Sequence, residues 1–155
     1  MDPLVRVCSL LNVAGASYLI AGAQACILNG MIRTTEDVDL LIEASEENCA
    51  RVLEGLAGME DGWARELEPR ELIENVVVKI SDEVEVDVST KAWTVTYAEA
   101  IESAQEVTID GVRIPYLGLD KLIESKSTYR EQDRLDVLRL LDLKARRDRE
   151  TSGDE

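Results

Sequence analysis

The tripeptide Asp37-Val38-Asp39 is the part of the chain whose residue types and spacing most suggest chemistry. It opens the segment DVDLLI, whose aliphatic residues predict a strand over residues 37–42. Residues i and i+2 of a strand share a face, so both carboxylates should point the same way while Val38 enters the core. Adjacent carboxylates repel each other unless a cation bridges them. The pair is therefore either a magnesium site or a solvated acidic pair at a strand end.

A third carboxylate occurs in a segment that alternates valine with acid, residues 84–88 (VEVDV). Alternation places the valines on one face, and Glu85 and Asp87 on the other. If this strand lies beside the first, Asp87 joins Asp37 and Asp39 in a three-carboxylate site. Such a site can hold two Mg²⁺ ions ~3.5–4 Å apart, one activating an attacking hydroxyl and one steadying a triphosphate. Mn²⁺ could replace Mg²⁺, and an ordinary amphipathic surface strand is the alternative interpretation.

Gly22 marks a turn at which a predicted strand over residues 17–21 ends and a helix begins at once. Glycine allows a ligand to approach the backbone closely. The free N–H groups of a helix start favour a phosphate group. Many strand-to-helix turns look like this one, so the turn does not identify a phosphate site by itself.

The elements that must position these residues follow from hydrophobic periodicity and turn signals. We expect helices over residues 3–14, 23–30, 45–58, 97–105, 119–125 and 130–147, and strands over 17–21, 37–42, 72–80, 83–89 and a hairpin over 107–114. The order predicts an α/β (α+β) fold, with a mixed β-sheet, helices mainly on one face and a helical C-terminus. Residues 1–147 should form one domain, and the apolar-free segment 148–155 should be disordered.

The pattern resembles the nucleotidyltransferase superfamily of the DNA polymerase β type, and especially its small bacterial members. The matching residues of the first segment are Gly22, Ala23, Asn29, Gly30, Arg33, Thr35, Asp37 and Asp39. Later matches are Lys126, Arg130, Asp133 and Asp136, so the resemblance covers roughly residues 17–141. Two positions depart from the family pattern: Ala23 replaces a Gly or Ser, and Asn29 replaces a His. Both changes concern the phosphate-binding half of the site and leave the acids intact.

The resemblance implies a metal-dependent enzyme that moves a nucleoside monophosphate from an NTP to a hydroxyl acceptor. Asp37 and Asp39 would bind both metals, and Asp87 the catalytic one. The start of the helix at Gly22 and Ala23 would cradle the phosphates. Arg33, Thr35, Lys126 and Arg130 are the further candidates for nucleotide binding. Trp93 and Tyr97 could stack on a base, although core packing is the more ordinary use of such residues.

Two alternatives remain open at this point. The chain could be a regulatory protein, for example one half of a toxin–antitoxin pair, that binds a small helical partner or forms a homodimer. It could also modify an antibiotic, since an acidic surface would attract a cationic aminoglycoside. Turnover of an NTP with Mg²⁺ separates the enzyme from the regulator.

Composition excludes several other classes of protein. The net charge of −15 disfavours broad nucleic-acid binding and anionic membrane surfaces. The absence of histidine excludes histidine-based catalytic triads and zinc ligands. The odd count of three cysteines, Cys8, Cys26 and Cys49, predicts buried thiols in a reducing compartment. No signal peptide or membrane span is evident, and we expect a cytoplasmic protein.

Overall fold

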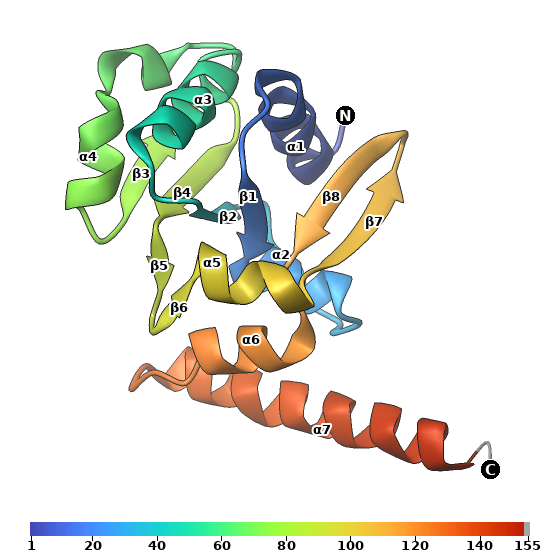
Figure 1. The fold of residues 1–155 in the computed structure, drawn as a ribbon. Coiled ribbons are helices and arrows are strands. Elements are labelled where there is room, and N and C mark those ends of the chain that lie inside the picture. The colour runs from blue at the N-terminus through green and yellow to red at the C-terminus, as the bar shows by residue number, and fades with distance from the viewer. Residues whose placement is uncertain (154–155) are drawn as a thin grey trace.

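The computed structural model describes residues 1–153, and a six-stranded mixed sheet forms its centre (Figure 1). The strand order is β3-β4-β2-β1-β8-β7. The strands are β1 (Tyr18–Ala21), β2 (Val38–Ile42), β3 (Val78–Ser81), β4 (Glu85–Ser89), β7 (Gln105–Ile109) and β8 (Val112–Tyr116). β2 runs antiparallel to β1 and parallel to β4, while β8 runs parallel to β1. The predicted mixed α/β sheet is therefore confirmed.

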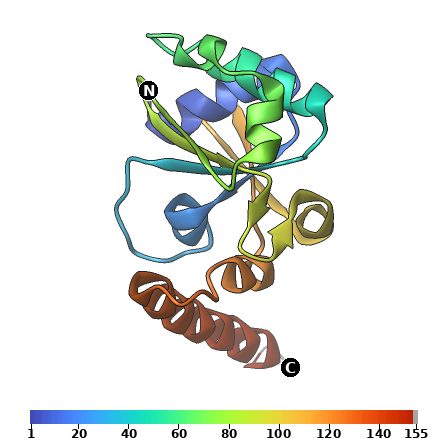
Figure 2. The same cartoon turned by 90° about the vertical axis from the view of Figure 1, so that its left-hand side faces the viewer.

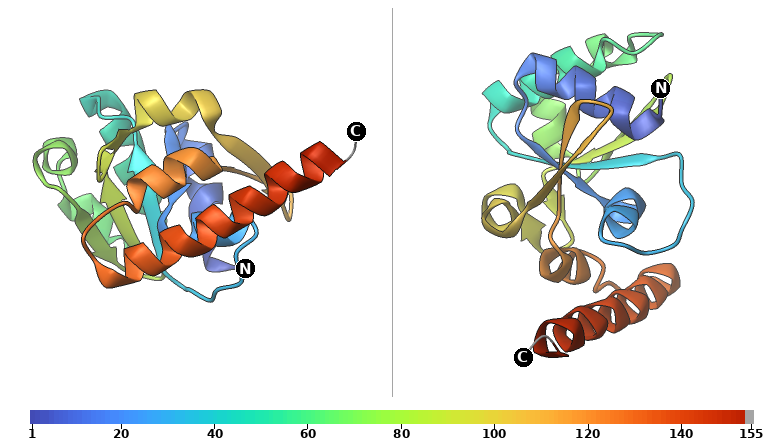
Figure 3. Two further views of the ribbon diagram at one scale, coloured as in Figure 1. Left: turned by 90° about the horizontal axis from the view of Figure 1, so that it is seen from below. Right: turned by 90° about the vertical axis from the view of Figure 1, so that its right-hand side faces the viewer.

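Helices lie on both sides of this sheet, whereas the sequence predicted them mainly on one face (Figure 2). The α-helices are α1 (Pro3–Ala14), α2 (Gly22–Leu28), α3 (Glu46–Leu56), α4 (Pro69–Glu74), α5 (Tyr97–Ala100), α6 (Leu119–Ser125) and α7 (Glu131–Gly153). Two short 3-10 helices, η1 (Trp63–Glu66) and η2 (Ile101–Ser103), lie between them. Figure 2 shows α1, α3 and α4 above the sheet, and α2, α5, α6 and α7 below it. The predicted helical C-terminus is confirmed: α7 passes beneath the rest of the molecule, as the view from below in Figure 3 shows.

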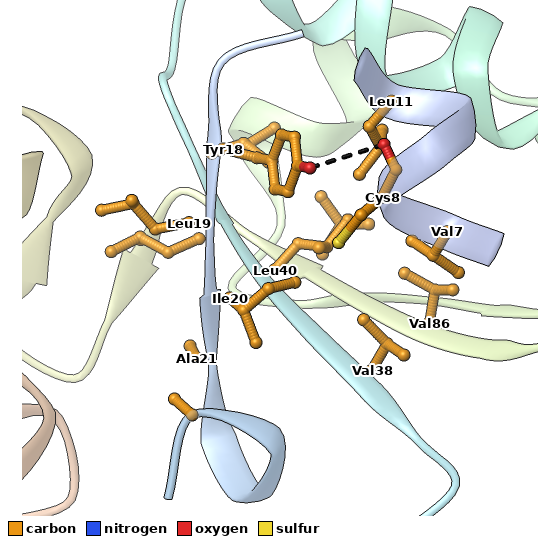
Figure 4. Packing of buried hydrophobic residues seen from close by; sticks show 14 of the residues in the cluster. Val7, Cys8, Leu11, Tyr18, Leu19, Ile20, Ala21, Val38, Leu40 and Val86 are labelled. Carbon is orange, nitrogen blue, oxygen red and sulfur yellow. Dashed lines mark hydrogen bonds between the residues drawn. The ribbon is translucent and has the colours of Figure 1, made fainter. Parts of the chain in front are cut away.

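The main hydrophobic core lies between the sheet and α1. Figure 4 shows side chains of β1, β2 and β4 directed toward those of α1. The labelled residues on this side, all at most 3% exposed, are Val7, Cys8, Leu11, Tyr18, Ile20, Val38, Leu40 and Val86. Because strand side chains alternate, burial of Val38 and Leu40 on this face turns Asp39 to the opposite face. The core thus fixes the direction of the acidic side chains.

One predicted strand is wrong in its first half. Residues 72–80 were expected to be extended, but residues 69–74 form α4 and β3 begins only at Val78. Pro69 occupies the first turn of α4, where its fixed φ suits a helix. Glu68 and Glu71 form a capping box at the same end. These start signals outweigh the β-branched residues that follow, and Leu72 is buried from a helix.

Residues 148–155 were expected to be disordered, but the structure places residues 148–153 in α7. α7 continues through Gly153, and residues 154 and 155 lie outside the described part. The Thr151 hydroxyl donates to the Arg147 carbonyl at 3.0 Å. Charged residues such as Arg and Glu sustain a helix without burial, so a lack of apolar residues did not end it.

The structure adds a small hairpin that the sequence did not predict, β5 (Lys91–Ala92) and β6 (Val95–Thr96). Its strands have two residues each, too few to carry a periodic signal. The three cysteines are buried and free, as expected. Within residues 1–153, every helix is too short or too polar to span a bilayer.

Candidate active site

Asp39 and Asp87 lie directly opposite each other on neighbouring parallel strands. The register of β2 and β4 pairs Asp39 with Asp87, with Val38 opposite Val86 on the core side. Neighbouring strands are ~4.8 Å apart, so the two carboxylates leave the sheet side by side. The structure therefore brings these two predicted site residues together on the face opposite α1.

Asp37 lies one residue before β2 and is exposed. Continuing the register by one position sets it beside Glu85, the first residue of β4. Desolvation, followed by the charge of Glu85, raises the pKa of Asp37. The acids thus form two facing pairs on neighbouring strands: an inner rung of Asp39 and Asp87, and an outer rung of Asp37 and Glu85. Glu85 was not among the predicted site residues, although valine–acid alternation already placed it on this face.

The inner rung is electrostatically strained. Burial raises the pKa of Asp39 from 3.8 to about 6, and the Asp87 carboxylate adds to the rise, while Lys126 opposes it. The Nζ of Lys79 lies 3.3 Å from Oδ1 of Asp87. That oxygen is nevertheless buried and accepts no hydrogen bond from any residue in the described part of the chain. A buried carboxylate oxygen without a hydrogen bond is costly; the Lys79 ammonium offsets part of its charge, and a bound cation would offset more.

Gly22 lies against the Asp39 carboxylate. Its φ is +60°, and a Cβ atom added there would be 1.9 Å from Oδ2 of Asp39. Both the backbone angle and the missing side chain are therefore required at this position. α2 begins at Gly22, and its N-cap residue, Ala21, makes no side-chain capping hydrogen bond. Ala23 follows in the first turn, where only its backbone could meet a ligand.

The acidic face, formed by Asp37, Asp39, Glu85 and Asp87, supplies only part of the ligand set that a divalent cation needs. Among residues 1–153, no three acidic, cysteine or histidine side chains converge into a compact ligand group. Asp39 and Asp87 fit such an ion, because they supply carboxylate oxygens, repel each other and include an oxygen without a hydrogen bond. The outer residue, Asp37, would have to turn inward to become the third ligand.

The predicted basic residues Arg33, Lys126 and Arg130 are paired with carboxylates of α7 and do not form a free cationic surface. Asp136, which is 0% exposed, accepts from Arg33 Nη1 at 2.6 Å and from Lys126 Nζ at 2.8 Å. Arg130 Nε donates to Asp133 Oδ2 at 2.9 Å. The sequence indicated that Arg33, Lys126 and Arg130 would face a triphosphate. It did not predict that these side chains pair with carboxylates of α7. The spacing of Asp133 and Asp136, three residues apart on one helix face, was the available signal.

Lys126 nonetheless lies within electrostatic reach of the acidic face, because its charge lowers the pKa of Asp39. Thr35 is positioned next to the first acid, since its Oγ1 accepts from the amide of Asp37 at 3.3 Å. Asn29 is a structural residue here. Its Nδ2 donates to the carbonyls of Ala25 at 2.9 Å and Leu117 at 3.0 Å, which ties the end of α2 to the segment before α6.

Known proteins share the sequence family and the fold of this chain. Residues 1–152 match the family described as "Nucleotidyl transferase of unknown function (DUF2204)". A solved structure similar to this chain is that of an antigenic nucleotidyltransferase-like protein from Paracoccidioides brasiliensis. It superposes with a TM-score of 0.52 at 16% sequence identity, over 92% of this chain and 76% of the other, which supports the fold alone. No curated protein matches the chain.

Proposed function

The chain belongs to this family of nucleotidyl transferases, and we propose that it moves a nucleoside monophosphate from an NTP to a hydroxyl acceptor, using Mg²⁺ held at Asp39 and Asp87. The observation that carries the proposal is the inner rung itself. Two carboxylates face each other there, one of them with a raised pKa and the other with a buried oxygen that accepts no hydrogen bond. A cation would relieve both costs at once.

In the proposed reaction, the acceptor oxygen attacks the α-phosphorus of the NTP and forms a new P–O bond. The bond from that phosphorus to the α–β bridging oxygen breaks, pyrophosphate leaves, and the hydroxyl proton passes to solvent. Bound Mg²⁺ would supply charge neutralisation and activation of the hydroxyl. Asp39 and Asp87 would position the reacting groups on the face of the sheet opposite α1, where catalysis rests on orientation and electrostatics. Mn²⁺ would serve in place of Mg²⁺, and a second ion would need Asp37.

The groups that would hold the triphosphate lie around this rung. The backbone of Gly22, which Ala23 follows in the first turn of α2, lies against Asp39, whose carboxylate occupies the space that a side chain at Gly22 would need. Lys126 already acts on Asp39 electrostatically and would offset phosphate charge. Arg33 and Arg130 would contribute only if the nucleotide displaced Asp136 and Asp133 from them. Thr35 would hold the segment of Asp37 in place.

The test compares Asp87→Asn with Asp37→Asn. If Asp87 serves the acceptor-side ion, Asp87→Asn should abolish transfer while the Kd for Mg²⁺–NTP stays within a few-fold, because that ion acts chiefly in the transition state. Asp37→Asn should weaken both, since Asp37 would hold the triphosphate-side ion. Calorimetric titration with each Mg²⁺–NTP measures affinity, and radiolabel transfer to a panel of hydroxyl acceptors measures turnover.

A wild-type protein that binds no Mg²⁺–NTP would overturn the proposal. Binding without transfer to any acceptor, with Asp87→Asn changing nothing, would instead favour a regulatory protein that keeps the fold for interaction. Asp110→Asn is the control for loss of one negative charge, because Asp110 is exposed in the turn between β7 and β8.

A further inference from the structure

Two large aromatic side chains, Trp93 and Tyr129, meet at the surface. Their ring centroids are 6.2 Å apart, with an angle of 66° between the ring planes, so the contact is edge-to-face. Trp93 is 49% exposed and Tyr129 is 76% exposed. In a chain with no phenylalanine and only two tryptophans, this aromatic pair lies at the surface rather than in the hydrophobic core.

The pair joins the two parts of the chain that border the acidic face. Trp93 lies in the turn between β5 and β6, a hairpin that directly follows β4, the strand of Asp87, and packs beside β2. Tyr129 lies between α6 and α7, in the short segment that also holds Lys126 and Arg130. Lys126 in turn acts electrostatically on Asp39. Figure 1 shows the hairpin and the α6–α7 segment at the same side of the molecule.

The backbone at Trp93 is strained. Its φ is +58°, in the left-handed region that glycine and asparagine adopt easily and bulky residues rarely occupy. A tight hairpin turn of this kind would be more stable with Gly or Asn. Neither burial nor turn chemistry therefore explains a tryptophan here, and strained residues of this sort cluster at ligand sites.

We propose that the exposed ring of Trp93, supported by its edge-to-face contact with Tyr129, is the stacking platform for the nucleobase of the bound NTP. This inference rests on the proposed function and adds where the base lies and what recognises it. An aromatic face stacks on any base, so it supplies affinity with little sequence selectivity. Purine nucleotides, which have the larger ring system, should bind more tightly than pyrimidine nucleotides.

The first measurement uses Trp93 as its own reporter. Trp63 is the other tryptophan and lies in η1, so Trp63→Phe leaves Trp93 as the single source of tryptophan fluorescence. Titration of this variant with Mg²⁺–ATP should quench the emission as the base stacks. Mg²⁺–tripolyphosphate, which has no base, should bind without quenching.

The second measurement is affinity in ring-deletion variants. Trp93→Gly removes the ring and also relieves the positive φ, so the melting temperature should stay close to the wild-type value. Its Kd for Mg²⁺–ATP should rise about 5- to 100-fold, the range expected for one base–aromatic stack, while the Kd for Mg²⁺–tripolyphosphate stays within two-fold. Tyr129→Ala should show a smaller change in the same direction. Trp63→Ala, which removes an exposed tryptophan elsewhere, should leave both Kd values unchanged.

The outcomes separate this inference from the proposed function. Equal binding of Mg²⁺–ATP and Mg²⁺–tripolyphosphate, unaffected by Trp93→Gly, would overturn the base platform and leave the metal and phosphate site standing. A large fall in melting temperature with no change in Kd would show that the pair only anchors the α6–α7 segment, and would also overturn it. If the wild type binds neither compound, the proposed function fails and this inference fails with it.

Discussion

Burial and the nearby charge of Asp87 both raise the pKa of the Asp39 carboxyl group. The pH dependence of stability therefore tests whether Asp39 lies in this site. Its pKa is about 6, above the ordinary 3.8, so between these values the folded state binds more protons than the unfolded state. The free energy of unfolding must therefore fall as pH rises from about 4 to about 7. The full stabilisation is present below about pH 4, and the loss amounts to at most roughly 3 kcal/mol.

Asp39→Asn should remove this dependence, because an amide does not ionise. In EDTA, urea unfolding at pH 4.5, 6.0 and 7.5 should show wild-type stability falling with pH and the variant nearly flat over that interval. At pH 7.5 the variant should be as stable as the wild type or more stable. Asp110→Asn should retain the wild-type slope. A slope that survives in Asp39→Asn would assign the titration to another acid.

Gly22 carries two separable requirements, a positive φ and the absence of Cβ. Gly22→Ala should therefore cost more than strain alone, because the added methyl group would collide with the Asp39 carboxylate. Gly15→Ala is the matched control: Gly15 has φ +72° in the C-cap of α1, and a Cβ there meets nothing within 4 Å. We expect the control to lose about 1 kcal/mol and Gly22→Ala roughly 2–4 kcal/mol, measured by urea unfolding. Equal losses would show that Asp39 moves aside freely.

At the scale of elements, α7 is joined to the segment before β2 by Asp136. Burial alone would raise the pKa of this carboxyl, but hydrogen bonds from Lys126 and Arg33 outweigh burial and lower it. Asp136→Asn would leave two cations without their shared carboxylate and should cost roughly 3 kcal/mol of unfolding free energy. The exposed pair of Asp142 with Arg146 is the control, since Asp142→Asn should cost less than about 0.5 kcal/mol. Thermal unfolding of both variants checks the difference.

If Asp136→Asn proves as mild as its control, the network is replaceable and Lys126 is freer to leave it for phosphate. A large cost would mean that Lys126 is committed to holding α7. The variant therefore also bears on how much of the basic cluster a nucleotide could recruit.

The elements differ in how far the sequence predicted them, and the difference has a physical origin. α1, β1, β2 and α6 were placed within a residue or so, because each combines clear periodicity with a cap or a breaker. The sequence did not predict α4. Its helix-start signals lie in a segment that resembles a loop, and the β-branched residues that follow favour a strand. Alternation in β4 predicted the face of Asp87, but neither its strand order nor its register could be read from one strand alone.

For the candidate site, too, the sequence predicted local geometry but not the contacts between distant elements. The sequence indicated which carboxylates share a face, and this follows from strand geometry alone. The pairing of Arg33 with Asp136 depends on how α7 packs against the loop before β2, which no local pattern contains. Arg130 and Asp133, by contrast, are only three residues apart in the sequence. The resemblance to other proteins included Asp133 and Asp136 beside these cations, but it did not indicate that the two carboxylates pair with them.

At the scale of the whole molecule, the net charge of −15 means that any cation stabilises the folded state. A specific Mg²⁺ site must therefore add stabilisation beyond this general effect of cations. NaCl should raise the melting temperature of the metal-free protein by screening repulsion among surface charges. At equal ionic strength and pH 7.5, MgCl₂ should raise it further. An ion present at about 100 times its Kd contributes about 2.7 kcal/mol, or roughly 5–10 °C for a chain of this size.

The excess of Mg²⁺ over Na⁺ should disappear in the double variant Asp39→Asn/Asp87→Asn, while the NaCl effect remains. Removal of both carboxylates of the inner rung eliminates the bridging site but changes the net charge by only two of fifteen units. The control is Asp110→Asn/Asp142→Asn, which makes the same charge change at two exposed positions away from β2 and β4. If Mg²⁺ keeps its full excess in the inner-rung variant, the ion binds elsewhere on the acidic surface. If Mg²⁺ never exceeds NaCl in the wild type, Asp39 and Asp87 do not hold a metal before nucleotide arrives, and the triphosphate would have to bring the ion with it.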